Sequence, residues 1–285
     1  MPVVPVADAQ VRYDVTGTAP GVPLLLLHGT GSAGSALTWG RAAPRFAASR
    51  TVLTPDLSGT DRTTDAGGPL TVEGLAAQVI AVIEHAGRGP VDLLGFSMGA
   101  PVSAAVAALR PDLVNRLVLV AGWARTADDE HLRNLFTLWR TIGRELPDSD
   151  AFGRHVILAG FSRGYLNEIG REQVEQFIPS LPPTPGTMRH VDLDLTLDVR
   201  ALLPRITAPV LVLGGTQDAT VPVGHSRALA AALPSAPYVR YAEVDAGHVL
   251  FFEREDEFTA LVEGFLEEDG STGNSRAERV AGGAA

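Results

Sequence analysis

Short apolar runs alternate with longer amphipathic stretches along much of the chain. A brief run of Val and Leu bounded by turn residues is typical of a strand that is buried on both faces. Their alternation with helical patterns predicts a mostly parallel sheet covered by helices on both sides, which is an α/β fold. The expected strands are Gln10–Val15, Pro23–His28, Thr51–Thr54, Val91–Gly95, Arg116–Ala121, Pro209–Gly214 and Tyr238–Val244.

The stretch Thr71–Ala86 shows how local chemistry predicts the limits of a helix. Thr71 can accept hydrogen bonds from free backbone amides at the start, and Leu75 and Val79 begin an apolar series at helical spacing. Gly87 is expected to end the helix. Further helices are expected at Met98–Leu109, Gly224–Leu233 and Glu255–Glu267.

The regular alternation stops after Ala121. Residues 124–205 contain several helical patterns, including Glu130–Arg144, and a Pro-rich stretch at Pro179–Pro185 that interrupts them. This pattern predicts a helical cap inserted into the sheet domain. The expected organisation is therefore a core of residues 1–123 and 206–268, a cap of residues 124–205, and a disordered tail at 269–285, which has few large apolar side chains.

Length and composition narrow the function classes. A chain of 285 residues can form one compact domain with an insertion. The formal net charge of −10 argues against nucleic acid as a partner, whose phosphates require a basic surface. All basic residues are Arg, and the Ala, Gly, Arg and Pro bias suits a GC-rich bacterial genome. A small-molecule substrate is the expected partner, with a homodimer left open as an alternative to a monomer.

Cysteine is absent, which excludes disulfides, a thiolate nucleophile and Cys-ligated metal. No leader pattern is found at the start of the sequence, and the apolar run Val22–Leu27 is far too short to span a bilayer. These observations predict a cytoplasmic protein without membrane attachment. Neither a metal nor an organic cofactor is expected.

The first candidate for chemistry is Ser97, in a Gly-x-Ser-x-Gly sequence formed by Gly95 to Gly99. The motif alone could equally be an ordinary Gly-rich loop. Here it follows a buried strand, Val91–Gly95, and precedes an Ala-rich helix. A nucleophile on such a turn is held at the edge of the sheet, where the helix N-terminus favours developing negative charge.

A serine hydroxyl is a weak nucleophile without a base, so a histidine at another strand end is required. His248 follows the last expected strand after Gly247, which lets the backbone turn tightly. Asp218 follows the apolar strand at Pro209–Gly214 and can orient the imidazole. The chain order is therefore Ser, Asp, His. Asp128 and Asp129 are the reserve candidates for the acid.

These motifs resemble those of the α/β-hydrolase superfamily. The resemblance extends from about Gln10 to Phe265 outside the cap, and rests on His28-Gly29-Thr30-Gly31, the turn at Ser97, Asp218 and Gly247-His248. It is strongest to small bacterial esterases and the cofactor-free haloperoxidase-like group. The resemblance implies an oxyanion hole formed by the backbone amides of Thr30 and Met98. The loop Asp56–Thr63 departs from the family pattern by lacking a second Gly, which weakens inference about the substrate.

Other residues of chemical interest have ordinary interpretations. His28 is expected to hold the geometry of its loop rather than act as a base. Asp192, Asp194 and Asp198 alternate like metal ligands, but no EF-hand-like Gly-bearing loop accompanies them, so a solvated face of the cap is favoured. Trp123, Phe136 and Trp139 are candidates to line an apolar substrate pocket, although packing in a helical core explains such residues equally well.

The sequence therefore predicts a serine hydrolase with the triad Ser97, Asp218 and His248. It would act through an acyl-enzyme on an ester, thioester or lactone of a small to medium, largely apolar substrate. Epoxide hydrolases and dehalogenases are disfavoured because related enzymes of those kinds need a carboxylate at the position of Ser97. A lyase, cyclase or acyl transferase could use the same triad, and a ligand-binding protein without activity is a further alternative.

Overall fold

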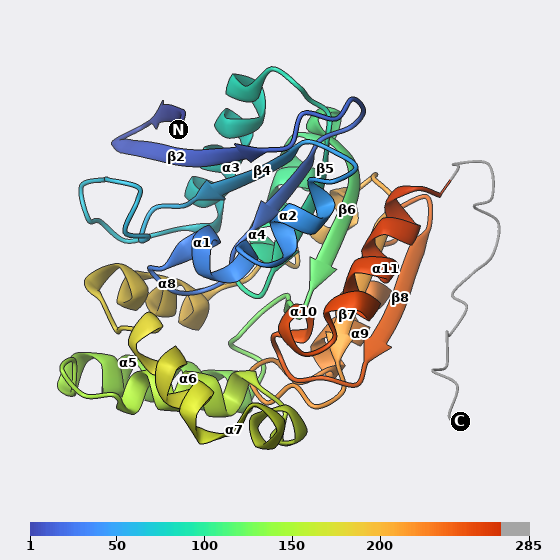
Figure 1. Ribbon diagram of the computed structural model, residues 1–285. Helices are drawn as coiled ribbons and strands as arrows, with labels where there is room; N and C mark the ends of the chain where they lie inside the picture. Colours follow the sequence, from blue (N-terminus) through green and yellow to red (C-terminus); the bar gives the residue numbers. More distant parts are fainter. Residues whose placement is uncertain (269–285) are drawn as a thin grey trace, which may run out of the picture.

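The computed structural model describes residues 1–268, whose central element is an eight-stranded sheet. The strand order is β1-β2-β4-β3-β5-β6-β7-β8 (Figure 1). Strand β2 runs antiparallel to both of its neighbours, and all other pairs are parallel. The strands are β1 (Val3–Val6), β2 (Ala9–Thr16), β3 (Leu24–Leu27), β4 (Val52–Asp56), β5 (Val91–Phe96), β6 (Val114–Val120), β7 (Val210–Gly215) and β8 (Val239–Val244).

Seven of these strands coincide with apolar runs that the sequence predicts, and β1 does not. Strand β1 contains Pro5 and pairs only with β2, for example Val3 with Arg12. Proline lacks the amide hydrogen of a ladder, so it is tolerated at a sheet edge and weakens the strand signal there. The edge position thus explains why the pattern missed this strand.

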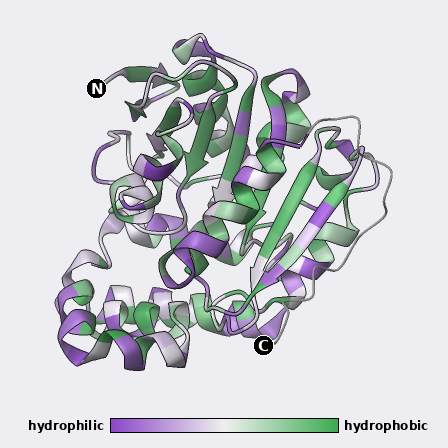
Figure 2. Cartoon of the chain, turned by 45° about the vertical axis from the view of Figure 1, so that its right-hand side comes forward, coloured by the Kyte–Doolittle hydropathy of each residue, from purple (hydrophilic) through white to green (hydrophobic). Residues whose placement is uncertain are grey.

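Alternation within the parallel strands separates two apolar cores. In β3, Leu25 and Leu27 pack into one core, and Leu24 and Leu26 pack into the other. The central strands are accordingly hydrophobic along most of their length (Figure 2). The first core lies under α3 (Val72–Ala86), α4 (Gly99–Leu109) and α9 (Gly224–Ala231); the second lies under α1 (Gly34–Trp39), α2 (Ala42–Phe46), α10 (Leu250–Glu253) and α11 (Glu255–Leu266).

Helix α3 begins and ends where the sequence indicates. The Thr71 hydroxyl accepts a hydrogen bond from the Gly74 amide at 3.0 Å, which satisfies one of the free amides of the first turn. Gly87 has a φ of 62°, and this left-handed conformation ends the helix at a residue that lacks Cβ. Local sequence therefore sets both limits.

Four helices lie between β6 and β7 and run beside the sheet domain (Figure 1). Helix α5 packs against both α6 and α8, and its buried Phe136 belongs to the same apolar cluster as Leu119 of the sheet. The division into a cap at 124–205 and a core stays a prediction. The helices are α5 (Glu130–Glu145), α6 (Ala151–Gly160), α7 (Arg163–Phe177) and α8 (Pro185–Thr196), with short 3₁₀ turns at Ile178–Ser180 and Leu203–Arg205 here and at Pro111–Leu113 before β6.

The sequence also leads to expectations about the C-terminal tail and about membrane attachment. The tail expected at residues 269–285 lies outside the described residues. Within residues 1–268, no helix combines the length and apolar character that crossing a bilayer requires. A cytoplasmic location, the absence of nucleic-acid binding and the choice between monomer and homodimer stay predictions.

Candidate active site

Ser97 stands on a tight turn between β5 and α4. Its φ is +53°, a left-handed conformation that is unusual for a residue with a side chain. The flanking glycines are required by space: a Cβ on Gly95 would lie 2.2 Å from the Gly99 carbonyl oxygen, and one on Gly99 would lie 2.5 Å from the His28 oxygen. Small residues therefore allow the backbone to fold back and present Ser97 at the end of the sheet.

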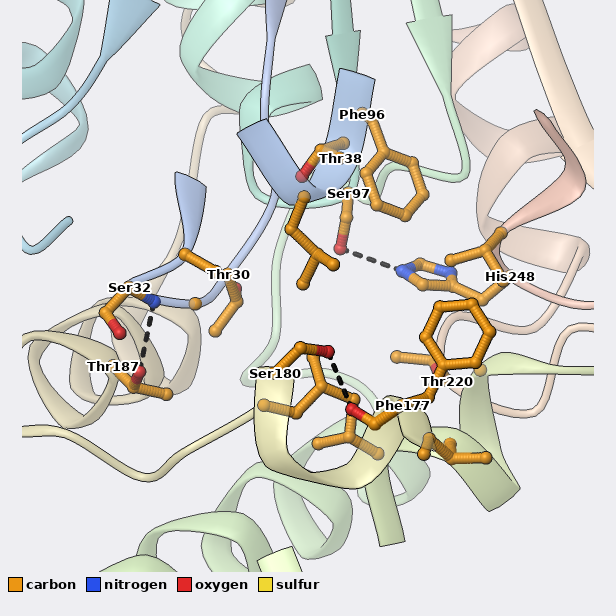
Figure 3. A pocket seen from close by; sticks show the side chains of 18 of the residues that line it. Thr30, Ser32, Thr38, Phe96, Ser97, Phe177, Ser180, Thr187, Thr220 and His248 are labelled. Carbon is orange, nitrogen blue, oxygen red and sulfur yellow. Dashed lines mark hydrogen bonds between the residues drawn. The ribbon is translucent and has the colours of Figure 1, made fainter. Parts of the chain in front are cut away.

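The three residues that the sequence proposes as a triad are joined by hydrogen bonds. The Ser97 Oγ lies 2.9 Å from His248 Nε2 (Figure 3). His248 Nδ1 lies 2.7 Å from Asp218 Oδ2. All three side chains are less than a tenth exposed. The arrangement brings together the ends of β5, β7 and β8, which are far apart in sequence.

Backbone donors hold the Asp218 carboxylate in position. Its Oδ1 accepts hydrogen bonds from the amides of Thr220 and Val221, both at 2.8 Å, and its Oδ2 is left for His248. The reserve candidates lie elsewhere. Asp129 caps α5 through the Leu132 amide at 2.8 Å, and Asp128 forms ion pairs with arginines. Asp218 is therefore the carboxylate that contacts the imidazole.

The loop that carries His248 is bonded to the turn between α6 and α7. The His248 amide donates to the Gly160 oxygen at 2.8 Å. The buried Glu253 carboxylate accepts from the amides of Gly247 and Ser162, at 3.1 and 2.7 Å. A Cβ on Gly247 would lie 2.6 Å from the Ser162 nitrogen, so glycine is needed for this close approach. The loop after β8 and the turn between α6 and α7 therefore position the imidazole together.

The loop after β3, residues 28–34, lies directly against the serine turn. A Cβ on Gly29 would come within 2.9 Å of the Ser97 Cβ. Among the hydrogen bonds of the described residues, none is donated by the backbone amides of Thr30 or Met98. Both amides belong to segments that adjoin Ser97, so they are suitable candidates for oxyanion donors. We call residues 28–34 the oxyanion loop.

His28 makes contacts expected of a residue that holds the geometry of its loop. Its Nδ1 donates to the Gly29 oxygen at 2.7 Å, and its Nε2 accepts from the Leu57 amide at 3.1 Å. Burial lowers the pKa of His28, which favours the neutral ring that both hydrogen bonds require. The side chain thus links the oxyanion loop to the loop after β4.

A pocket opens above Ser97 and His248, and its walls are largely apolar (Figure 3). Its empty volume, including the space at its open mouth, is about 990 Å³. Within the described residues, its lining includes no Asp, Glu or Arg side chain. Phe96, Trp139, Phe152, Phe161, Phe177, Phe251 and Phe252 supply the aromatic surface, and Thr30, Thr38, Ser180 and Thr220 add hydroxyl groups.

Two of the three expected pocket residues do not line this pocket. Trp123 is fully buried, its Nε1 donates to the Thr126 hydroxyl at 2.8 Å, and its ring packs against Phe136. Phe136 faces the same apolar core. Trp139 does reach the pocket, because it lies at the far end of this aromatic series. Proximity of Trp123 to a strand end was therefore insufficient to place its side chain at the site.

Asp194 also differs from expectation, because it is fully buried rather than part of a solvated face. Its Oδ2 accepts a hydrogen bond from the Thr30 hydroxyl at 2.6 Å, and its Oδ1 has no hydrogen-bond partner among the described residues. Burial raises the pKa of Asp194 to about 8. Asp192 and Asp198 are the solvated members of the series and form ion pairs with arginines.

A metal site finds no support in the described part of the chain. Within residues 1–268, no group of three or more His, Asp or Glu side chains is arranged to hold a metal ion. The alternating aspartates do not converge, since Asp194 points into the protein while Asp192 and Asp198 bind arginines outside it. The three side chains therefore lie on different faces of the segment 192–198.

Comparison with known proteins agrees with this geometry. Residues 22–255 match the family model described as alpha/beta hydrolase fold. The chain is 38% identical to a pyrrolizixenacetamide deacetylase of Xenorhabdus hominickii, over 92% of this chain and 97% of the relative. It is 32% identical to the putative non-heme bromoperoxidase BpoC of Mycobacterium tuberculosis, over 86% and 92%. The chain therefore belongs to the α/β-hydrolase family.

Solved structures support the same fold. The enol-lactonase from Burkholderia xenovorans LB400 superposes with a TM-score of 0.80 at 23% identity, covering 94% of this chain and all of that one. Such low identity establishes the fold alone. The predicted fold class and the resemblance to the esterase and bromoperoxidase groups are confirmed. Relatives named as hydrolases support a hydrolytic activity.

Proposed function

We propose that the protein is a serine hydrolase in which Ser97 attacks a carbonyl carbon and His248 is the general base. The observation that carries this proposal is the continuous hydrogen-bonded array from Ser97 Oγ through His248 to Asp218, with distances of 2.9 and 2.7 Å. A strained serine that contacts the imidazole below an apolar pocket is the arrangement required for covalent acyl transfer.

The reaction follows from the positions of the protons. His248 Nε2 takes the Ser97 proton as Oγ bonds to the carbonyl carbon, and the carbonyl π electrons move to oxygen. The resulting oxyanion is stabilised by the amides of Thr30 and Met98. The imidazolium then gives its proton to the leaving group as the bond to that group breaks. Water, deprotonated by His248, releases the acid from the acyl-enzyme and restores Ser97.

Asp218 serves this cycle without exchanging a proton with the substrate. Its Oδ2 holds the Nδ1–H tautomer of His248, so that Nε2 is left as the acceptor for the Ser97 proton. When His248 becomes positively charged, the adjacent carboxylate stabilises it. The two backbone amides on Oδ1 keep this carboxylate from rotating away.

The pocket supports a neutral and largely apolar substrate. Its aromatic walls gain from burying apolar surface, while a charged group would lose hydration without finding an opposite charge in the described lining. An ester, thioester or lactone of small to medium size meets these conditions. The carbonyl must reach Ser97, and the apolar part would contact residues such as Trp139 and Phe252.

An acetamide is a second candidate substrate. It is favoured by the 38% identical relative that is named a pyrrolizixenacetamide deacetylase. The proposed chemistry is the same, except that His248 must protonate a nitrogen as the C–N bond breaks. Amide hydrolysis therefore depends more strongly on the imidazolium as an acid than ester hydrolysis does.

Covalent labelling followed by a substrate panel tests the proposal. Intact-protein mass after brief fluorophosphonate treatment should rise by one adduct in the wild type and remain unchanged in Ser97→Ala. The matched control Ser49→Ala changes an exposed serine whose hydroxyl binds the Phe46 carbonyl, and it should be labelled like the wild type.

The panel should contain neutral esters, thioesters, lactones and an aryl acetamide. Turnover that disappears in well-folded Ser97→Ala would support the hydrolase. Labelling without turnover would favour a lyase, cyclase or acyl transferase using the same array. Labelling that persists in Ser97→Ala would reject Ser97 as the nucleophile.

A further inference from the structure

Helix α8 directs three buried polar side chains toward the active site. Thr187, His190 and Asp194 are separated by three and then four positions, which places them on one face of the helix. Their exposed fractions are 2%, 0% and 0%. Polar groups are rarely buried to this extent unless they meet specific partners. The polar side chains on this face are therefore expected to bind specific groups of a neighbouring segment.

Each of these side chains binds one of three consecutive residues of the oxyanion loop. The contacts involve the side chain of the first residue and the backbone amides of the next two, and one of them is drawn in Figure 3. The Thr30 hydroxyl donates to Asp194 Oδ2 at 2.6 Å, the Gly31 amide donates to His190 Nδ1 at 3.2 Å, and the Ser32 amide donates to Thr187 Oγ1 at 3.1 Å.

The oxyanion loop needs such support because its own sequence is permissive. Gly29, Gly31 and Gly34 lie within a few positions of one another, and Gly31 has a φ of +133°. Glycine gives a chain wide conformational freedom. A backbone amide stabilises an oxyanion only while it points at that atom. The Thr30 amide belongs to the Gly29–Thr30 peptide, whose oxygen accepts a hydrogen bond from His28 Nδ1. The bonds made by the Thr30 side chain and the Gly31 amide hold Thr30 from its other side, and together these contacts restrict the direction of the Thr30 amide.

His190 also connects the oxyanion loop to the loop after β4. Its Nε2 donates to the Ser58 oxygen at 2.8 Å, which leaves Nδ1 as the acceptor for Gly31. Burial lowers the pKa of His190 to about 3, so the ring stays neutral and Nδ1 keeps its lone pair across the working range. A Cβ on Gly59 would lie 2.5 Å from His190 Nε2, which shows how closely the two elements pack.

A bidentate ion pair holds α8 itself against the core. The Arg189 guanidinium binds both oxygens of Asp65 at 2.9 Å, and its Nε donates to the Gly68 oxygen at 2.7 Å. At the other end of the helix, the Thr126 hydroxyl donates to the Asp194 carbonyl at 2.5 Å. The helix is therefore a fixed support and can transmit its position to the loop.

We infer that Thr187, His190 and Asp194 are positioning residues that align the Thr30 amide for the oxyanion of the reaction. This inference rests on the proposed serine-hydrolase function. The three residues bind the oxyanion loop and act through it on the transition state; Thr187 also borders the pocket, whereas His190 and Asp194 do not line it. They stabilise the tetrahedral intermediate more than the bound substrate, because the amide meets full negative charge only after Ser97 has attacked.

Removal of one support should therefore lower kcat with little change in KM. Asp194→Leu removes the acceptor of the Thr30 hydroxyl, and the isosteric Thr187→Val removes the acceptor of the Ser32 amide. Each should lower kcat per labelled active site about tenfold or more, since small displacements of a catalytic group are costly. Asp194→Asn and Thr187→Ser should recover most of the loss. Thr196→Val is the matched control, because Thr196 is exposed and, within residues 1–268, its hydroxyl binds carbonyls of α8 alone.

A trifluoromethyl ketone provides a readout that a purely structural role would not change. It forms an alkoxide adduct with an activated serine, so its inhibition constant should rise in proportion to the loss in kcat, with KM within about twofold of wild type. Thermal melting identifies any variant that does not fold, and the isosteric Thr187→Val decides the question if Asp194→Leu fails.

The outcomes separate this inference from the proposed function. An active wild type with folded variants of unchanged kcat would overturn the role of α8 and leave the hydrolase intact. A loss in kcat accompanied by unchanged ketone affinity would overturn it as well. A wild type that is neither labelled nor active would refute the proposed function, and the positioning role with it.

Discussion

The buried carboxyl of Asp194 should make the stability of the protein fall as the pH rises. Its pKa is raised by burial from the ordinary value of 3.8 to about 8. Between these two values the folded state retains a proton that the unfolded state has lost, so increasing pH favours unfolding. The contribution is fully favourable below pH 3.8 and is lost as the pH passes through about 8.

The size of the effect follows from the pKa difference. Each unit corresponds to about 1.4 kcal/mol, so a shift of about four units amounts to on the order of 6 kcal/mol when complete. Asp194→Asn removes this titration and keeps an oxygen that can accept from Thr30. The stability of the variant relative to wild type should therefore increase by up to about 1.4 kcal/mol per pH unit from pH 5 to 7, and level off above about pH 9.

Urea denaturation at several pH values between 5 and 9.5, followed by circular dichroism, measures this difference. Other titrating groups are common to both proteins and cancel. Asp198→Asn is the control from the same segment: hydrogen bonds from Arg200 lower the pKa of Asp198, so its carboxylate is ionised throughout this range and its difference should be flat. A flat difference for Asp194→Asn, or one that falls with pH, would refute a protonated buried carboxyl.

Four further substitutions test the active site and its pocket. Asp218→Asn should lower kcat by about four orders of magnitude, because the wrong His248 tautomer is favoured; a loss below tenfold in steady-state kinetics would contradict its role. Gly29→Ala places a methyl group against Ser97, where a Cβ would lie 2.9 Å from the Ser97 Cβ, and should slow fluorophosphonate labelling at least tenfold in a folded protein. Trp139→Ala should raise KM for bulky apolar esters, because Trp139 lines the pocket. Trp123→Ala should instead lower the unfolding free energy by about 3–5 kcal/mol, because Trp123 is buried in the core. A raised KM in Trp123→Ala with an unchanged KM in Trp139→Ala would reverse the pocket assignment.

The parts of this protein that could be predicted from sequence are those in which a local pattern and its structure share the same residues. Buried strands appear as continuous apolar runs because both faces of the sheet are covered. The turn at Ser97 requires glycines at fixed positions, since side chains there would collide with the backbone. Asp218 and His248 were found because parallel strands end at one edge, so residues that follow different strands meet.

Side chains whose partners lie far away in the sequence were harder to interpret. Trp123 follows a strand at the correct edge, yet its ring turns into the core, where Thr126 satisfies its indole nitrogen. Asp194 belongs to an alternating acidic series that resembles a solvated surface, and only its neighbours lie outside. Composition and spacing do not reveal which face of a helix is buried, because the residues that bury it belong to a distant segment of the chain.

The sequence alone determined the α/β class, most of the strands, and the residues that converge as Ser97, Asp218 and His248. Tertiary structure decided which aromatic residues line the pocket above Ser97, and that α8 is hydrogen-bonded to the oxyanion loop. The physical reason is the range of each interaction. Turns, caps and strand patterns depend on neighbours along the chain, whereas the hydrogen bonds of Thr187, His190 and Asp194 form only when a distant helix and loop are packed together.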